Sequence, residues 1–230
     1  MTKTAIVLAG GLGTRLKTIL GGLPKPMADV NGRPFLQYLL EYLRSQGIGN
    51  CILSVGYRRE AIMEYFGRYF GGIDLTYCIE DEPLGTGGAI KKALTCTDAR
   101  EVFVLNGDTL FRADLPELYD LYSSNDCAFA MALKPMRDFD RYGVVIVDET
   151  HRVIGFQEKM PRTFGLINGG VYVLDTGVFD GLDLPAGFSI EKDFLECYYK
   201  SRRFYGFEFD AYFIDIGIVE DYERAKTELA

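Results

Sequence analysis

The stretch LAGGLGTRLKTILGGLPKPM, residues 8–27, combines a glycine-rich loop with Arg15 and with Lys25 between two prolines. Because glycine has no Cβ, the backbone N–H groups of such a loop can approach a triphosphate closely. The Arg15 guanidinium can donate two parallel hydrogen bonds to phosphate oxygens. Lys25, held stiffly by its prolines, can neutralise charge that grows on a phosphorus under attack. On these residues alone, a triphosphate-binding loop and a glycine-rich surface turn both remain open.

Two widespread phosphate loops do not match this stretch. A P-loop requires the pattern GxxxxGK[ST], which the sequence lacks. A dinucleotide fingerprint requires a third glycine where Leu16 stands, and no helix-start signal follows it. The loop therefore belongs to a different, longer kind.

Two carboxylates follow apolar runs of strand length. Asp108 stands in LNGDTL, and Asp215 stands in YFIDIG. Two acidic residues from separate strands are what a Mg²⁺ ion bridging two phosphate-bearing substrates requires. A plain turn is the alternative at residues 106–108, because Asn-Gly and Gly-Asp are favoured turn pairs.

The elements that must hold these residues alternate between strand and helix. Apolar periodicity and flanking Pro and Gly signals predict helices over residues 34–46, 58–70, 87–95 and 114–124. Strands are predicted over residues 4–9, 51–57, 73–80, 101–106 and 127–134. Five strands with helical crossovers indicate an α/β fold with a mainly parallel sheet, and ligands of such sheets bind beyond the C-terminal strand ends.

The second half of the sequence changes character. Short turns separate predicted strands at residues 142–148, 152–159 and 166–175, which indicates antiparallel additions to the sheet. Two further helices are expected around residues 189–200 and 219–229, with strands at residues 204–209 and 211–216 between them.

Composition excludes several other classes of chemistry. The net charge of −8 argues against a nucleic-acid partner, which would require a basic face. The only histidine, His151, stands in the polar stretch DETHRV, where a hairpin turn is expected. A Ser-His-Asp triad or a His-ligated zinc site is therefore hard to build, and any metal should be hard and oxygen-bound.

Residues 1–230 are expected to form a single domain, because no linker, repeat or low-complexity segment divides them. No apolar run approaches the ~20 residues of a membrane span, so no membrane partner is expected. The five cysteines are odd in number and lack a CxxC pair, and the opening MTKTAIVLAGG indicates a strand, so a reduced, cytoplasmic protein is predicted. The sequence stops without hexapeptide repeats, so no C-terminal β-helix is expected. Some of the fifteen tyrosines could serve a homodimer interface.

LAGGLGTRL, followed by LPKPM and NGRPFLQYLL, resembles the motifs of the sugar-1-phosphate nucleotidyltransferases, and later motifs extend the resemblance over nearly the whole chain. The resemblance implies a single Rossmann-like, glycosyltransferase-A-like fold. Its nucleotide-binding half would cover about residues 1–135, and its sugar-binding half about residues 136–230. It implies Mg²⁺ on Asp108 and Asp215, and a catalytic set of Arg15, Lys25 and Asp108. The implied nucleotide-binding residues are Leu8, Ala9, Gly10, Gly11, Gly13, Thr14, Arg15, Glu80, Gly85, Thr86 and Asn106.

The stretch EDEPLGTGGAI, residues 80–90, resembles the base-recognition loop of this family; on its own it could equally be a strand-to-helix turn with a capping Thr86. Glu80 falls where related enzymes tend to carry a glutamine that contacts the base. A carboxylate only accepts hydrogen bonds, so it suits guanine, whose N1–H and N2–H₂ groups both donate. This favours GTP as the nucleotide.

Four further segments match sugar-binding motifs of the family. Lys159 would hold the sugar phosphate and Glu158 would accept hydrogen bonds from hydroxyls, while Gly143 and Gly169 would let backbone groups reach the ring. Glu191 could instead be a helix-dipole charge near a Ser189 cap, and the others could be turns or solvated strand edges. The implied sugar-binding residues are Tyr142, Gly143, Glu158, Lys159, Asn168, Gly169 and Glu191.

The implied reaction joins a sugar 1-phosphate to a nucleoside triphosphate, giving a nucleotide-sugar and pyrophosphate. Among family branches, residues 11–43 are most similar to the heptose-1-phosphate guanylyltransferases, which make GDP-heptose for surface polysaccharides. Mannose-1-phosphate guanylyltransferases and uridylyltransferases remain open, as does a regulatory subunit that binds nucleotide-sugar without turnover. A glycosyltransferase of similar topology would require a DxD motif, and none follows an early strand.

Overall fold

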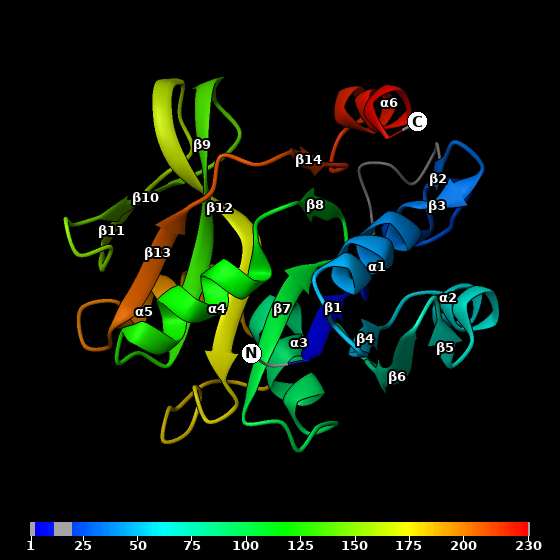
Figure 1. Cartoon of the computed structure of the whole chain (residues 1–230), viewed down its shortest axis with the longest axis horizontal. Helices are drawn as coiled ribbons and strands as arrows, with labels where there is room; N and C mark the ends of the chain where they lie inside the picture. The colour runs from blue at the N-terminus through cyan, green and yellow to red at the C-terminus, as the bar shows by residue number, and fades with distance from the viewer. Residues whose placement is uncertain (1–2, 12–19, 230) are drawn as a thin grey trace.

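The computed structural model describes residues 3–11 and 20–229 (Figure 1). Within these residues ten strands form one mixed sheet in the order β5-β6-β4-β1-β7-β12-β10-β11, with β9 paired to β12 and β13 paired to β9. The strands of this sheet are β1 (Thr4–Leu8), β4 (Asn50–Val55), β5 (Tyr69–Phe70), β6 (Ile73–Ile79), β7 (Glu101–Asn106), β9 (Phe129–Phe139), β10 (Val144–Val147), β11 (Val153–Gln157), β12 (Arg162–Asp175) and β13 (Phe204–Glu208).

Two short strand pairs lie outside this sheet. One joins β2 (Asp29–Val30) to β3 (Arg33–Pro34), and the other joins β8 (Thr109–Phe111) to β14 (Phe213–Asp215). The helices are α1 (Phe35–Ser45), α2 (Arg59–Phe66), α3 (Gly85–Leu94), α4 (Leu115–Ser124), α5 (Glu196–Tyr198) and α6 (Val219–Glu228), with a 3₁₀ turn η1 (Lys25–Met27) and a π-helix η2 (Ile190–Leu195).

The predicted parallel core is confirmed for four strands: β1 pairs in parallel with β4 and β7, and β4 pairs in parallel with β6. The fifth predicted strand, β9, runs in the same direction but does not join them directly. The antiparallel strand β12 lies between β7 and β9 and pairs with both. Sequence periodicity cannot show such an insertion, because strand order is set by contacts between distant segments.

The helix predicted over residues 58–70 is too long. It ends at Phe66, because Gly67 adopts φ +60° and turns the chain. Tyr69–Phe70 then forms β5, which pairs antiparallel with β6. The hairpin turn predicted around His151 is confirmed, since His151 is exposed with φ +64° between β10 and β11.

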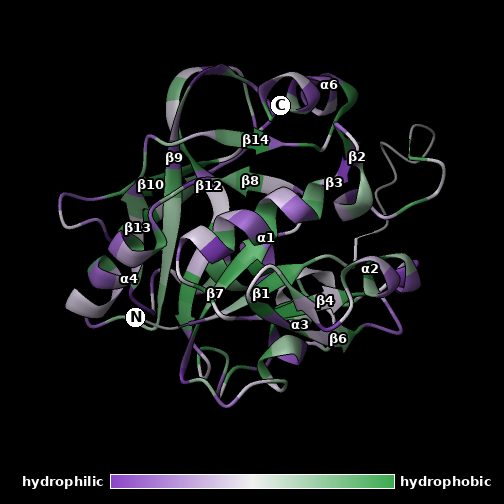
Figure 2. Ribbon diagram, turned by 45° about the vertical axis from the view of Figure 1, so that its right-hand side comes forward, coloured by the Kyte–Doolittle hydropathy of each residue, from purple (hydrophilic) through white to green (hydrophobic). Residues whose placement is uncertain are grey.

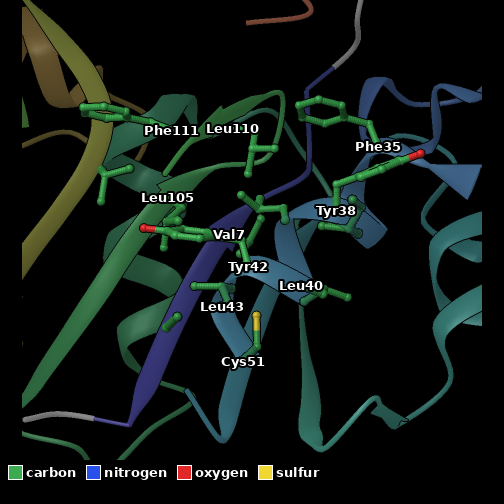
Figure 3. Packing of buried hydrophobic residues seen from close by; sticks show 14 of the residues in the cluster. Val7, Phe35, Tyr38, Leu40, Tyr42, Leu43, Cys51, Leu105, Leu110 and Phe111 are labelled. Carbon is green, nitrogen blue, oxygen red and sulfur yellow. The ribbon is translucent and has the colours of Figure 1, made fainter. Parts of the chain in front are cut away.

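Apolar side chains alternate between the two faces of the central strands, and helices cover both faces. Ala5 and Val7 of β1 face the layer of α1, α2, α4 and α6, whereas Ile6 faces the layer of α3 and η2. In Figure 1, α4 lies in front of the sheet and α3 behind it. Figure 2 shows the central strands mostly green and α6 mostly purple. In Figure 3, side chains of α1 such as Tyr42 and Leu43 point toward those of the strands.

The strands of the second half form a mostly antiparallel unit, in which β13 pairs in parallel with β9. The hairpin β10–β11 continues from β12, while β9 and β13 extend the sheet on the other side of β12. An isolated bridge between Arg152 and Tyr205, and a hydrogen bond from Gly206 N to His151 O (2.9 Å), tie the hairpin back to β13. The β10–β11 hairpin is thereby fixed in place.

Four aromatic rings join η2 to the sheet behind this unit. The Phe129 ring lies 5.3 Å from that of Tyr172, 6.0 Å from that of Phe194 and 5.4 Å from that of Phe204. All four side chains are essentially inaccessible to solvent. Ring packing of this kind stabilises beyond its buried area, so Phe129 is a main anchor of η2.

Replacing Phe129 with alanine should lower the free energy of unfolding by about 3–5 kcal/mol, because a cavity would open among the remaining rings. Urea unfolding followed by circular dichroism measures this loss. Phe164→Ala, at a ring that is half exposed, is the matched control and should cost about 1 kcal/mol or less. Equal losses in the two variants would contradict the anchoring role of Phe129.

Candidate active site

Three charged side chains from distant parts of the chain meet at one edge of the sheet. Lys25 Nζ lies 2.9 Å from Asp108 Oδ2. Asp215 lies near this pair, because it is paired with Thr109 in the β8–β14 register and because Ile216 N donates to Asp108 O at 3.0 Å. The structure thus brings together the three residues that the sequence predicted for phosphate and metal chemistry. It also adds Tyr142, whose hydroxyl donates to Asp215 Oδ2 at 3.3 Å.

Local sequence fixes Lys25 and Asp108 tightly. Lys25 opens the 3₁₀ turn η1, with Pro24 extended before it and Pro26 buried within it. Asp108 follows Gly107, whose N–H donates to Leu8 O at 3.0 Å. A Cβ on Gly107 would lie 2.5 Å from that same oxygen. The close approach of β7 to β1 therefore requires glycine immediately before Asp108.

The electrostatics of this cluster favour an added cation. Burial, and then the neighbouring Asp108, raise the pKa of the Asp215 carboxyl, and Lys25 opposes that rise. Burial and then Asp215 raise the pKa of the Tyr142 hydroxyl, so this hydroxyl stays protonated and donates to the carboxylate. Two carboxylates share a partly buried space with one lysine, and more positive charge would stabilise both.

The donor set fits a hard divalent cation that keeps other oxygen ligands. Asp108 and Asp215 offer carboxylate oxygens, which Mg²⁺ prefers. No group of three or more His, Cys, Asp or Glu side chains placed to hold a metal occurs in the part of the chain that the structure describes. Mg²⁺ commonly binds through one or two carboxylates plus water and substrate phosphates, so two carboxylates here are sufficient.

The predicted nucleotide side lies at the ends of β1, β4 and β6. Ala9 N donates to Ser54 O at 2.8 Å, and the Ser54 hydroxyl donates to Glu80 Oε1 at 2.7 Å. A Cβ on Gly10 would lie 2.6 Å from Glu80 Oε1, so glycine allows the carboxylate to lie against the loop. Gly11 is exposed, with nothing within 4 Å of a would-be Cβ. Gly13, Thr14 and Arg15 lie outside the described residues.

The glycines of the predicted base-recognition loop, residues 80–90, have a packing role that sequence patterns do not reveal. Gly85 adopts φ +67°, and a Cβ there would lie 2.6 Å from Phe188 O. Gly87 N donates to that same oxygen at 2.9 Å. The alternative in which Thr86 caps the helix does not hold, because α3 already begins at Gly85 and Thr86 Oγ1 instead accepts from Ile190 N at 2.9 Å. These contacts join the loop to the segment that leads into η2.

The predicted sugar residues gather around one cavity of about 390 Å³. It opens between the end of β11, the start of β10 and the helix η2. Six of the seven predicted residues line it, and so do six that the sequence analysis did not assign. The lining consists of Tyr142, Gly143, Val144, Val145, Phe156, Gln157, Glu158, Lys159, Asn168, Glu191, Lys192 and Glu196.

Asn168 connects the cavity wall to its surroundings. Its Nδ2 donates to Glu191 Oε1 at 2.9 Å and to the Tyr172 hydroxyl at 2.8 Å, and its Oδ1 accepts from Gly170 N at 3.0 Å. Ser189 caps η2 as expected, since its hydroxyl accepts from Lys192 N at 3.2 Å. Glu191 therefore combines a first-turn position in the helix with a direct bond to the cavity wall.

Gly169, the seventh predicted sugar residue, is absent from the cavity lining. A Cβ on it would lie 2.3 Å from the Phe111 ring, so glycine is required there for packing against β8. The neighbouring Gly170 adopts φ +69° at the irregularity in β12 and leaves room for the Asn106 amide. This part of β12 supports the cavity from behind.

Sequence reasoning missed Ser54, Lys192 and Glu196. A signal existed for Ser54, because a serine interrupts the apolar strand CILSV just where β4 ends. Lys192 in η2 and Glu196 directly after it carried none, because a π-helix changes which residues share a face. Only the folded chain shows that Glu196 lies on the cavity.

Comparisons with known proteins show which family this chain belongs to. A family model described as Nucleotidyl transferase matches residues 4–230. The D-glycero-alpha-D-manno-heptose 1-phosphate guanylyltransferase of Aneurinibacillus thermoaerophilus is 50% identical, over 98% of this chain and 97% of its own length. The protein of the same description from Campylobacter jejuni is 51% identical, over 95% and 96%.

Among solved structures, HddC from Yersinia pseudotuberculosis complexed with GMP-PN superposes with a TM-score of 0.87. It shares 38% sequence identity, and the match covers 100% of both chains. Both kinds of match extend over the nucleotide side and the sugar cavity. This chain belongs to the nucleotidyl transferase family.

Proposed function

We propose that this protein is a sugar-1-phosphate guanylyltransferase that joins GTP to D-glycero-α-D-manno-heptose 1-phosphate, giving GDP-heptose and pyrophosphate. The observation that carries the proposal is the position of Lys25, Asp108 and Asp215 beside the predicted nucleotide side, with Tyr142 linking them to the sugar cavity. Two relatives about half identical to this chain are heptose 1-phosphate guanylyltransferases, which supports the choice of base and sugar.

An oxygen of the sugar phosphate attacks the α-phosphorus of GTP in line with the departing pyrophosphate. A new P–O bond forms at the α-phosphorus, and its bond to the oxygen that bridges to the β-phosphorus breaks. A phosphate monoester is mostly dianionic near pH 7, because its second pKa is ~6. No general base is then required, which agrees with a single exposed histidine placed in a hairpin turn.

Repulsion between the two polyanionic substrates is the main obstacle, and cations of the site reduce it. Lys25 neutralises charge at the α-phosphorus, Arg15 contacts the leaving pyrophosphate and Lys159 holds the sugar phosphate. Mg²⁺, when bound by Asp108 and Asp215, supplies further positive charge to the phosphate oxygens. Tyr142 keeps the Asp215 carboxylate oriented by donating a hydrogen bond to it.

Glu80 is the group that we assign to guanine. One of its oxygens accepts from Ser54, which fixes the carboxylate beside Gly10. The remaining lone pairs can accept from the two adjacent donors of the guanine edge. Uracil and thymine present a mixture of acceptors and one donor, so a carboxylate suits them less well.

Three observations bear on the setting of the reaction. Within the described residues, no helix is long and apolar enough to cross a membrane. All five cysteines are free thiols, which supports a reducing, cytoplasmic setting. Tyr65 and Tyr69 are exposed on the neighbouring elements α2 and β5, and a homodimer interface that includes them stays a prediction.

The protein should release pyrophosphate only when Mg²⁺, GTP and heptose 1-phosphate are present together, because each supplies part of the reacting assembly. A phosphate-release assay coupled to pyrophosphatase, run with ATP, CTP, GTP, UTP and dTTP and with heptose or mannose 1-phosphate, measures this. EDTA should abolish the signal. Binding of GDP-heptose without turnover of any pair would refute catalysis and favour a regulatory subunit.

Lys25→Met should lower kcat by roughly 10²–10³, by analogy with the loss of one preorganised oxyanion donor. Steady-state kinetics at saturating GTP and sugar phosphate measure the change. Lys226→Met, which removes a lysine from the surface pair with Glu223, is the matched control and should keep kcat. Unchanged turnover in Lys25→Met would exclude Lys25 from catalysis.

Asp215→Asn should raise the Mg²⁺ concentration for half-maximal rate by at least about tenfold, since even outer-shell partners of a metal are typically worth 10–100-fold in affinity. Mn²⁺ binding, followed by electron paramagnetic resonance, tests the same site without turnover. Asp210→Asn, in an ion pair with Lys134, serves as the control. Equal Mn²⁺ affinity in wild type and Asp215→Asn would contradict the assignment.

A further inference from the structure

The helix η2 winds as a π-helix where it borders the sugar cavity, and this changes which side chains face the cavity. Glu196 N donates to Glu191 O, a bond between residues five apart. In an α-helix, residues five apart point about 140° from each other, because each residue turns ~100°. The wider π-turn brings positions five apart closer to one face of the helix. Glu191, Lys192 and Glu196 accordingly all line the cavity.

Glu196 lines the cavity in charged surroundings that differ from those of Asp215. The charged groups that act most on it are Glu158, Lys192, Glu191 and Asp193, whereas those that act most on Asp215 are Asp108 and Lys25. Asn168 Nδ2 donates to Glu191 Oε1 at 2.9 Å on the lining of the cavity. The π-turn then leads from Glu191 to Glu196. Tyr142, whose hydroxyl donates to Asp215, marks the end of the cavity next to the Asp108–Asp215 cluster.

Glu158 directly follows β11 and Glu196 directly follows η2, so the two carboxylates reach the cavity from different parts of the fold. Desolvation, and then the negative charge of Glu158, raise the pKa of the Glu196 carboxyl, although the residue stays exposed to solvent. A pair of neighbouring hydroxyl groups can donate to two such acceptors. Val144, Val145 and Phe156 supply the apolar wall that a sugar-binding cavity also needs.

We infer that Glu196 is a specificity-determining residue that accepts hydrogen bonds from the exocyclic hydroxyls of the sugar, the 6,7-diol of a heptose. This inference rests on the proposed function. The 1-phosphate must reach the Asp108–Asp215 end, so the side of the sugar remote from C1 enters the Glu196 end. A heptose and a mannose of the same ring configuration differ there by one CHOH unit, and a site built around that hydroxyl discriminates against the sugar that lacks it.

The test compares heptose 1-phosphate with mannose 1-phosphate in wild type, Glu196→Ala and Glu196→Gln. With Glu196→Ala, kcat/KM for heptose 1-phosphate should fall about 10- to 100-fold, the range for losing one hydrogen bond to a charged group. The value for mannose 1-phosphate should fall less than about threefold, and the KM for GTP should stay unchanged. Glu196→Gln keeps an acceptor oxygen, so its loss should be intermediate.

Calorimetric titration with GDP-heptose and GDP-mannose gives a readout that does not depend on turnover. Glu196→Ala should weaken the binding of GDP-heptose by a larger factor than the binding of GDP-mannose. Glu149→Ala removes an exposed glutamate from the β10–β11 turn. As the control, it should leave the affinity for both ligands unchanged.

Equal losses for the two sugars, or no loss for either, would overturn the assignment of Glu196. If Glu196→Ala proves unstable in urea unfolding, the isosteric Glu196→Gln decides by the same comparison. Failure of the wild type to make or bind GDP-heptose would instead refute the proposed function, and the inference with it.

Discussion

Two carboxylates that must lie side by side impose the central constraint on this molecule. Asp108 and Asp215 stand 107 residues apart in sequence, and the short pair β8–β14 holds them together although their charges repel. Lys25 offsets part of that repulsion at 2.9 Å from Asp108. Such a cluster is costly unless cations or hydrogen bonds compensate it, and the surrounding structure supplies both, through the proline-framed turn η1 and through Tyr142.

The antiparallel half of the sheet connects this charged cluster to the cavity. Strand β12 crosses from β10 to β7 at an irregularity between Asn168 and Tyr172. Asn168 faces the cavity there, while Tyr172 enters the aromatic cluster around Phe129. The same cluster holds η2 through Phe194. One buried group of rings thus determines where the polar residues of two different elements meet.

Several glycines that resemble ligand-binding positions are required by packing as well. Gly85, Gly107 and Gly169 each lie against backbone or ring atoms at distances that leave no room for a Cβ. A motif of glycines therefore reports two constraints at once, a close approach of backbone to backbone and a close approach of backbone to ligand. Only the folded chain shows which of the two constraints applies to a given glycine, because both leave the same pattern in the sequence.

The residue pattern indicated Lys25, Asp108 and Asp215 as candidates, and the family resemblance added Glu158 and Asn168. The sequence by itself also determined the four parallel strands and most helices. Local periodicity and turn residues encode such features, because they depend on neighbours in the chain. Only the tertiary structure decided that β12 separates β7 from β9, that Tyr142 bonds Asp215, and that a π-turn directs Glu196 into the cavity. Strand order and side-chain pairing depend on contacts between residues far apart in sequence, and a helix adopts a π-turn when tertiary packing compensates for its poorer local geometry.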